Sequence, residues 1–141
     1  MGLMWREIGE IVWPGLVVLV AHAILRALFG HEPYVDPVMH FSGGVAAAYF
    51  FLHLPRLTPR YFGKIAPVTR YLLGFGLVTV VAVLWEFGEY LADFFLSTRM
   101  HQTIGGTLRD LFNGMSGATV LMGIDFWLWQ RGEPCSPDGT E

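Results

Sequence analysis

Charge and cysteine are both scarce in this sequence. Of its 141 residues, 15% are charged and 53% belong to the apolar set AVILMFWYC, which excludes a disordered chain. The single cysteine, Cys135, cannot form an internal disulfide and lacks the paired spacing of a zinc site. The formal charge is -3 and no run of Lys and Arg occurs, so nucleic acid is not an expected partner.

Long apolar segments dominate residues 1–131. They cover about residues 8–29, 37–54, 71–96 and 107–130. Because ~20 helical residues cross a ~30 Å hydrocarbon layer, this pattern predicts an all-α, integral membrane four-helix bundle with a short polar tail over 132–141. A signal peptide is the alternative for the first segment, since Arg6 precedes the apolar run. Glu7 and Glu10 disfavour it, because a signal peptide begins with a basic region.

The stretch between the second and third apolar segments is basic. It contains Arg56, Arg60, Lys64 and Arg70. Since positive loops stay in the cytoplasm, we expect this stretch and both chain termini on the cytoplasmic side of a bacterial inner membrane. Pro55, Pro59 and Pro67 are expected to end the flanking helices.

The second apolar segment carries a surface of small residues. They are Gly43, Gly44, Ala46, Ala47 and Ala48. Small side chains let transmembrane helices approach closely, so this surface is expected to pack against another helix and could also serve a homodimer.

Three of the predicted helices carry polar residues at helical spacing, at the end expected to face away from the cytoplasm. These residues are Asp36 and His40, then Glu86, Glu89 and Asp93, then Asp110 and Asn113, and Gly117 continues the last spacing and leaves room for a neighbouring helix. A charge at membrane depth costs at least ~2.5 to 3.5 kcal/mol, so the five carboxylates need a neutraliser. We expect Arg99 and Arg109 to supply part of the positive charge, with Arg26 a distant third. A bound cation is the simplest source of the rest.

These residues predict a metal site. Its predicted ligands are Asp36, His40, Glu86, Glu89, Asp110 and Asn113, with His22 or His101 as a further imidazole. Oxygen ligands with one or two imidazoles suit a divalent Zn, Mn, Fe or Ca ion. The alternative is a structural network of salt bridges and water that holds the helices in register.

The other polar residues of the segments have simpler expected roles. His31 and His53 are expected at the membrane interface, and His22 is expected either to pack in the core or to support the site. Asp125 lies toward the opposite, cytoplasmic end and is expected to pair with Arg131 or with the basic stretch.

The ordered motifs resemble those of a known family. Asp36-Pro-Val-Met-His40-Phe41, Trp85-Glu86-Phe-Gly-Glu89 and Asp110-Leu-Phe-Asn113-Gly-Met-Ser-Gly117 are similar to the D-x3-H-F, E-x2-Q/E and D-x2-N-x3-G motifs of VanZ-like membrane proteins. The Trp-Glu-x-x-Glu stretch with Gln102-Thr103 also resembles the YjdF-like inner-membrane proteins. The resemblance implies a small polytopic bacterial membrane protein, in one branch linked to glycopeptide (teicoplanin) resistance. Glu89 stands where the VanZ-like pattern has Gln, a departure that argues against resistance and adds negative charge.

Three classes of function fit these observations. The first is a binding protein of the cell envelope, whose metal recognises a membrane lipid or a lipid-linked head group. The second is a membrane hydrolase, in which the metal lowers the pKa of a bound water toward ~7 and Glu89 or Asp93 is the general base. The third is a proton or cation transporter, for which the cytoplasmic half supplies little beyond His53 and Asp125.

Overall fold

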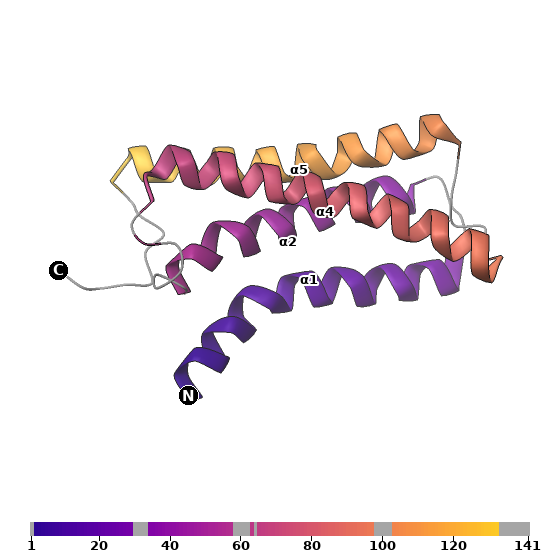
Figure 1. Cartoon of the computed structure of the whole chain (residues 1–141), viewed down its shortest axis with the longest axis horizontal. Coiled ribbons are helices and arrows are strands. Elements are labelled where there is room, and N and C mark those ends of the chain that lie inside the picture. The colour runs from indigo at the N-terminus through magenta and orange to yellow at the C-terminus, as the bar shows by residue number, and fades with distance from the viewer. Residues whose placement is uncertain (1, 30–33, 58–62, 64, 98–102, 133–141) are drawn as a thin grey trace.

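The computed structural model of the chain describes residues 2–29, 34–57, 63, 65–97 and 103–132. In these ranges it contains helices only, and the predicted all-α helical bundle is confirmed (Figure 1). The helices are α1 (Gly2–Phe29), α2 (Val35–Leu57), α4 (Pro67–Leu96) and α5 (Ile104–Gln130). Successive helices run in opposite directions, so α1 and α4 end where α2 and α5 begin (Figure 1). Residues 133–141 of the predicted polar tail lie outside the described residues.

Each helix begins a few residues earlier than its apolar segment predicts. Pro67 begins α4, because proline at a first helical position needs no hydrogen-bond partner and its φ angle suits the helix. Thr103 caps α5, and its hydroxyl oxygen accepts a hydrogen bond from the Gly106 amide at 3.3 Å. The expectation that Pro55 ends its helix is wrong, since α2 continues to Leu57.

Two of the helices have the length and apolarity of membrane spans. They are α1 over Ile8–Phe29 and α4 over Pro67–Leu96. Large apolar side chains on both helices face outward, including Leu28, Leu72 and Phe94, which are 70%, 71% and 70% exposed. Helices α2 and α5, with 23 and 27 residues, are also long enough to cross a bilayer, although glycine and polar residues make them less apolar.

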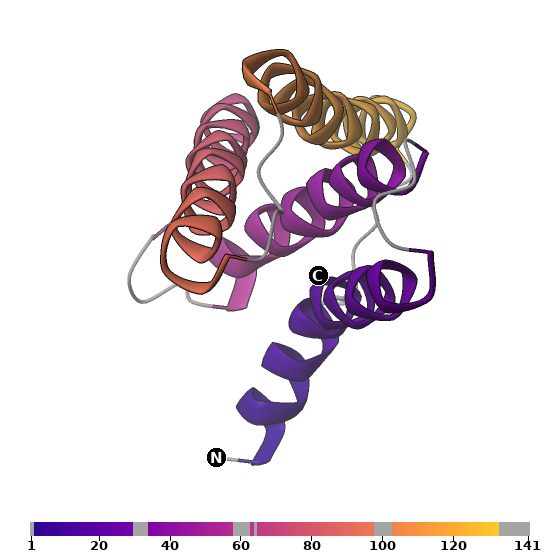
Figure 2. The same cartoon turned by 90° about the vertical axis from the view of Figure 1, so that its right-hand side faces the viewer.

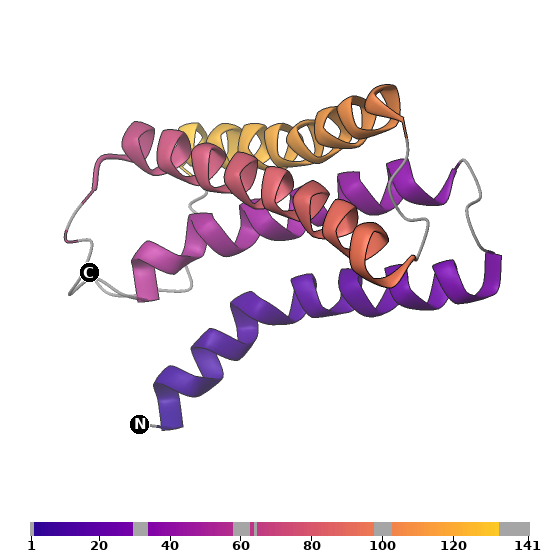
Figure 3. The same cartoon turned by 45° about the vertical axis from the view of Figure 1, so that its right-hand side comes forward.

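Helix α2 is the centre of the bundle. It packs against α1, α4 and α5, whereas α1 packs on α2 alone among the described helices (Figure 2). Helix α1 therefore runs along the side of α2 that faces away from α5, and it bends in its first half, where it contains Pro14 (Figure 3). The small apolar core consists of Ala48, Leu52, Val78, Ala118 and Met122.

Glycines set the close contact between α2 and α5. A Cβ atom at Gly44 would overlap the Gly114 carbonyl oxygen, and a Cβ atom at Gly117 would overlap the Phe41 carbonyl oxygen. The predicted small-residue surface of α2 is thus used within the chain, where it brings two backbones together. A homodimer through this surface stays a prediction.

The end of the bundle farthest from the predicted metal site has its own ion pair. Asp125 accepts hydrogen bonds from the Tyr71 hydroxyl at 2.6 Å and from Arg70 Nη2 at 3.1 Å. Asp125 therefore pairs with the last cation of the basic stretch, one of its two expected partners. Arg131, the other expected partner, stacks on the Trp127 ring at 3.8 Å.

We predict that Gly117→Ala and Gly123→Ala change stability in opposite directions. Alanine favours a helix interior over glycine by roughly 0.5 to 1 kcal/mol, and a Cβ atom at Gly123 has no neighbour within 4 Å. At Gly117 the overlap with Phe41 should instead lower the free energy of unfolding by about 1 to 3 kcal/mol. Unfolding by SDS in mixed micelles measures both values. Equal shifts in the two variants would contradict the packing described above.

Candidate functional site

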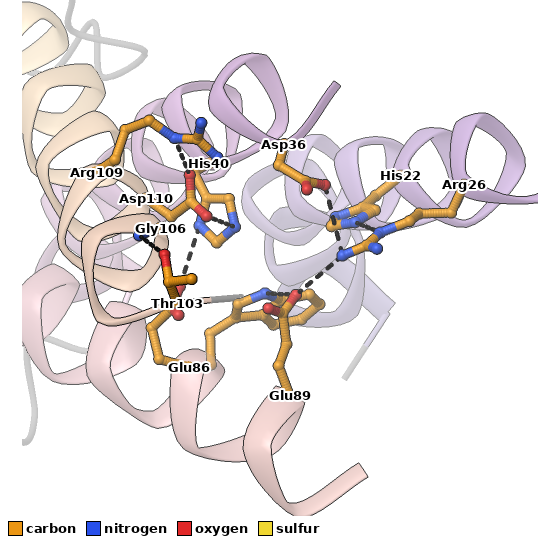
Figure 4. A network of polar contacts seen from close by, with 11 residues as sticks. His22, Arg26, Asp36, His40, Glu86, Glu89, Thr103, Gly106, Arg109 and Asp110 are labelled. Carbon is orange, nitrogen blue, oxygen red and sulfur yellow. Dashed lines mark hydrogen bonds and ion pairs between the residues drawn. The ribbon is translucent and has the colours of Figure 1, made fainter. Parts of the chain in front are cut away.

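One end of the bundle gathers buried ionisable side chains. The carboxylates are those of Asp36 on α2, Glu86 and Glu89 on α4, and Asp110 on α5, each in a residue no more than 8% exposed. We call these four residues, together with His40, the acidic end (Figure 4). The sequence predicts all five as metal ligands, and the folded chain brings them to the same region.

Three side chains from three helices face one another inside the acidic end. His40 Nδ1 lies 3.7 Å from Glu86 Oε1, and His40 Nε2 lies 4.0 Å from Asp110 Oδ2 (Figure 4). One potential ligand atom from each of the three residues lies within 4.8 Å of the others. Glu86 Oε1 is buried and makes no hydrogen bond in the part of the chain that the structure describes. Because buried polar atoms are normally hydrogen-bonded, this oxygen is a place for a proton or a cation.

Local helix geometry explains this convergence. Asp36 and His40 are one turn apart, so both side chains leave α2 on the same face. On α5, Asp110 is one turn before Gly114, and a Cβ atom at Gly114 would lie 3.6 Å from the His40 carbonyl oxygen. The close approach of α5 to α2 therefore places Asp110 beside the His40 ring.

Arg26 is the cation at the centre of the acidic end. Its Nη2 atom lies 3.5 Å from Asp36 Oδ1 and 3.9 Å from Glu89 Oε1, so it joins α1 to both α2 and α4 (Figure 4). Arg26 Nε donates a hydrogen bond to His22 Nε2 at 3.2 Å. The expectation that Arg26 is a distant third among the arginines is wrong, because its long side chain reaches across from the end of α1.

His22 supports this arginine. A ring nitrogen that accepts a hydrogen bond carries no proton, so His22 is neutral and acts as an orienting partner for Arg26. The buried His22 ring lies 5.9 Å from the Trp85 ring and 6.5 Å from the His40 ring. Of its two expected roles, support of the site fits this geometry.

Glu89 and Asp110 have further partners. Trp85 Nε1 donates a hydrogen bond to Glu89 Oε1 at 3.0 Å, a contact that the sequence reasoning missed. The spacing of Trp85 and Glu89, one turn apart on a helix, was the available signal for it. Arg109 Nε lies 3.3 Å from Asp110 Oδ1, and the Arg109 side chain is 42% exposed.

The structure places the remaining candidate residues outside the close group. Asn113 and Asp93 are both half-buried, and the group with metal-ligand spacing contains neither of them. His53 contacts the Tyr49 carbonyl oxygen of its own helix through Nδ1 at 2.8 Å, toward the other end of α2. Three further residues with expected roles lie outside the described residues. They are His31, Arg99 and His101.

The formal charges at the acidic end do not balance. It holds four carboxylates, and the cations beside them in the described residues are Arg26 and Arg109. With all four carboxylates ionised, two negative charges are left for His40, for protons on the carboxyl groups or for a bound cation to neutralise. The charge deficit and the Glu86 oxygen without a hydrogen bond thus lie at the same place.

Comparison with known proteins gives a family. The family model described as "Predicted membrane protein (DUF2238)" matches residues 11–131. This range contains α2, α4, α5 and all but the first turns of α1, and therefore the whole acidic end. No curated protein and no solved structure matches the chain.

We predict that Arg26→Met destabilises the protein strongly. The substitution leaves Asp36 and Glu89 buried without their shared cation, and breaking a buried ion pair costs about 3 to 5 kcal/mol. Unfolding in mixed micelles measures the loss. Adding Asp36→Asn to Arg26→Met should recover part of it, because one uncompensated charge is removed.

Arg6→Met is the matched control. Arg6 pairs with Glu10 at 3.5 Å, but both side chains are mostly exposed, so this pair contributes at most about 1 kcal/mol. If the Arg6 and Arg26 variants lost the same stability, Arg26 would not have the central position assigned to it.

Proposed function

The chain belongs to this family of membrane proteins, and from that premise we propose that it binds a divalent metal ion through His40, Glu86 and Asp110. One observation carries the proposal: three potential ligand atoms from three helices lie within 4.8 Å of one another. In addition, Glu86 Oε1 makes no hydrogen bond in the described chain. One imidazole and two carboxylates form a donor set that suits zinc, manganese or iron, and calcium accepts the oxygens.

The proposed ligand set is smaller than the one predicted from the sequence. Asp36 and Glu89 both lie beside Arg26, so the geometry supports them as partners of the arginine, whereas His40, Glu86 and Asp110 form the group with metal-ligand spacing. Three protein ligands leave coordination positions open, as in metal sites that bind a substrate or water. Small side-chain rotations would bring the three ligand atoms into contact with one ion, since a metal with oxygen and nitrogen ligands needs distances of about 2.1 Å.

The open positions would take an anionic oxygen of a lipid head group. The acidic end lies between helices whose outer surfaces are apolar, so a ligand from the membrane reaches it more directly than one from the cytosol. A bound divalent ion would neutralise the two excess negative charges and attract the anion. Arg70, the last cation of the basic stretch, lies beside Asp125 at the other end of the bundle. The positive charge of this stretch supports the placement of the site in the outer leaflet of a bacterial inner membrane with both termini inside.

The geometry supports binding more strongly than hydrolysis or transport. Glu89 accepts a hydrogen bond from Trp85 and lies beside Arg26, so two contacts already hold the carboxylate that would have to serve as the general base. A transport path from the acidic end to Asp125 would have to cross the apolar core around Leu52 and Val78.

We predict that Glu86→Gln and Asp110→Asn remove the metal. The purified wild-type protein, loaded with one of zinc, manganese, iron(II) or calcium and then dialysed, should hold roughly one ion per chain, and both variants should hold close to none. Elemental analysis by mass spectrometry measures the content. The same metal should raise the unfolding temperature of the wild type and not that of Glu86→Gln.

Asp125→Asn is the control for this experiment. Asp125 is also a half-buried carboxylate beside an arginine, but it lies at the opposite end of the bundle, so its loss should leave the metal content unchanged. A wild-type protein that binds none of the four metals, or a Glu86→Gln variant with wild-type content, would show that the acidic end is a structural salt-bridge network.

A further inference from the structure

A cavity of about 500 Å³ lies between α1, α2 and α4. Its walls are almost entirely apolar and include Leu16 and Leu19 on α1, Phe50 on α2, and Val81 on α4. Residues of both α1 and α4 line it, while the backbones of these two helices do not pack on each other, so the cavity is a groove along α2. We call it the α1–α4 groove.

The groove ends at the metal site. His22, His40 and Trp85 all line it, and these three residues hold Arg26, Glu86 and Glu89 through the contacts described above. A molecule that fills this space therefore needs a long apolar part and a polar part at one end. That is the chemistry of a membrane lipid.

We propose that one acyl chain of a membrane lipid lies in the α1–α4 groove, with its head group at the acidic end. The groove is formed by the two helices that are apolar enough to span a bilayer, so it lies at the depth of the lipid tails. The position of the head group rests on the proposed metal site, whereas the acyl chain in the groove rests on the cavity itself. The site would thus recognise an anionic lipid by its head group and its tail together.

The size of the groove favours an acyl chain over a helix from a second copy of the protein. A helix about 10 Å wide that rises 1.5 Å per residue occupies roughly 120 Å³ per residue. A whole helix does not fit into a space of about 500 Å³, so a second copy would insert only side chains into the groove. An extended acyl chain is thin enough to follow the groove along α2, and a volume of this size is typical of sites for small ligands.

Two glycines provide a way to fill the groove without disturbing the bundle. Gly15 and Gly43 line it, and a Cβ atom at either position has no neighbour within 4 Å. Leucine is also a better helix former than glycine, so Gly15→Leu with Gly43→Leu should fold. Gly76→Leu is the matched control, because Gly76 on α4 is exposed, has equally open surroundings and does not line the groove.

The test uses a lipid that labels the protein on illumination. The full chain is reconstituted in vesicles of equal parts phosphatidylcholine and phosphatidylglycerol, with a trace of phosphatidylglycerol that carries a diazirine on one acyl chain. Mass spectrometry then maps the labelled residues. In the wild type the label should concentrate on groove residues such as Leu19, Phe50 and Val81.

The double leucine variant should lose most of the label on the groove. Displacing about two buried methylene groups weakens binding by about tenfold, so labelling should fall by at least that factor, while Gly76→Leu should label like the wild type. Equal labelling of the groove in all three proteins would overturn the proposal. Wild-type label that spreads evenly over the outward faces of α1 and α4 would also overturn the proposal, and this result needs no variant.

Metal content, measured on the same samples, separates this proposal from the previous one. Lost groove labelling with unchanged metal content supports the acyl chain as a distinct part of the site. Native mass spectrometry of the same proteins tests whether a second copy of the protein fills the groove. A dimer that the double leucine variant disrupts would assign the groove to that second copy and overturn the lipid proposal.

Discussion

The balance of buried charge at the acidic end is the constraint on which the rest of the structure depends. Four carboxylates from three helices are buried, and an uncompensated buried charge is energetically costly. Arg26 comes from the remaining helix and contacts Asp36 on α2 and Glu89 on α4. The backbone of α1 packs on α2 alone among the described helices, so its contacts with α4 are made by side chains, namely Arg26 with Glu89 and His22 with Trp85. Arg26 thus balances charge and helps to fix the position of a helix.

Close backbone packing makes this arrangement possible. In a membrane, helices gain little by hiding apolar side chains from lipid, so association depends on close contact between small residues. Gly44, Gly114 and Gly117 provide that contact between α2 and α5. The same contact sets the distance between His40 and Asp110, because Gly114 is one turn beyond the aspartate and faces the His40 carbonyl oxygen. Packing and the geometry of the site therefore have a common cause.

The two ends of the bundle differ in how completely their buried charge is balanced. At the Asp125 end, one carboxylate is matched by one arginine and one hydroxyl group, so the formal charge of the pair is balanced. At the acidic end, the carboxylates outnumber the neighbouring arginines of the described residues, and the apolar α1–α4 groove leads up to them. An excess of buried negative charge destabilises a purely structural contact. Beside an apolar groove, the same charge suits a bound cation and an amphiphilic ligand.

The sequence by itself determined which residues share a helix face. Turn spacing put Asp36 with His40 and Glu86 with Glu89, and the apolar runs determined the four helices to within a few residues, because both follow from the period of a single helix. Only the tertiary structure decided which arginine or histidine each carboxylate contacts. Arg26 lies beside Asp36 and Glu89, whereas Glu86 and Asp110 face His40, with Arg109 also beside Asp110. This pairing depends on how far a long side chain reaches from one helix to the next. Packing between the helices sets that distance, and the sequence pattern of a single helix does not specify it.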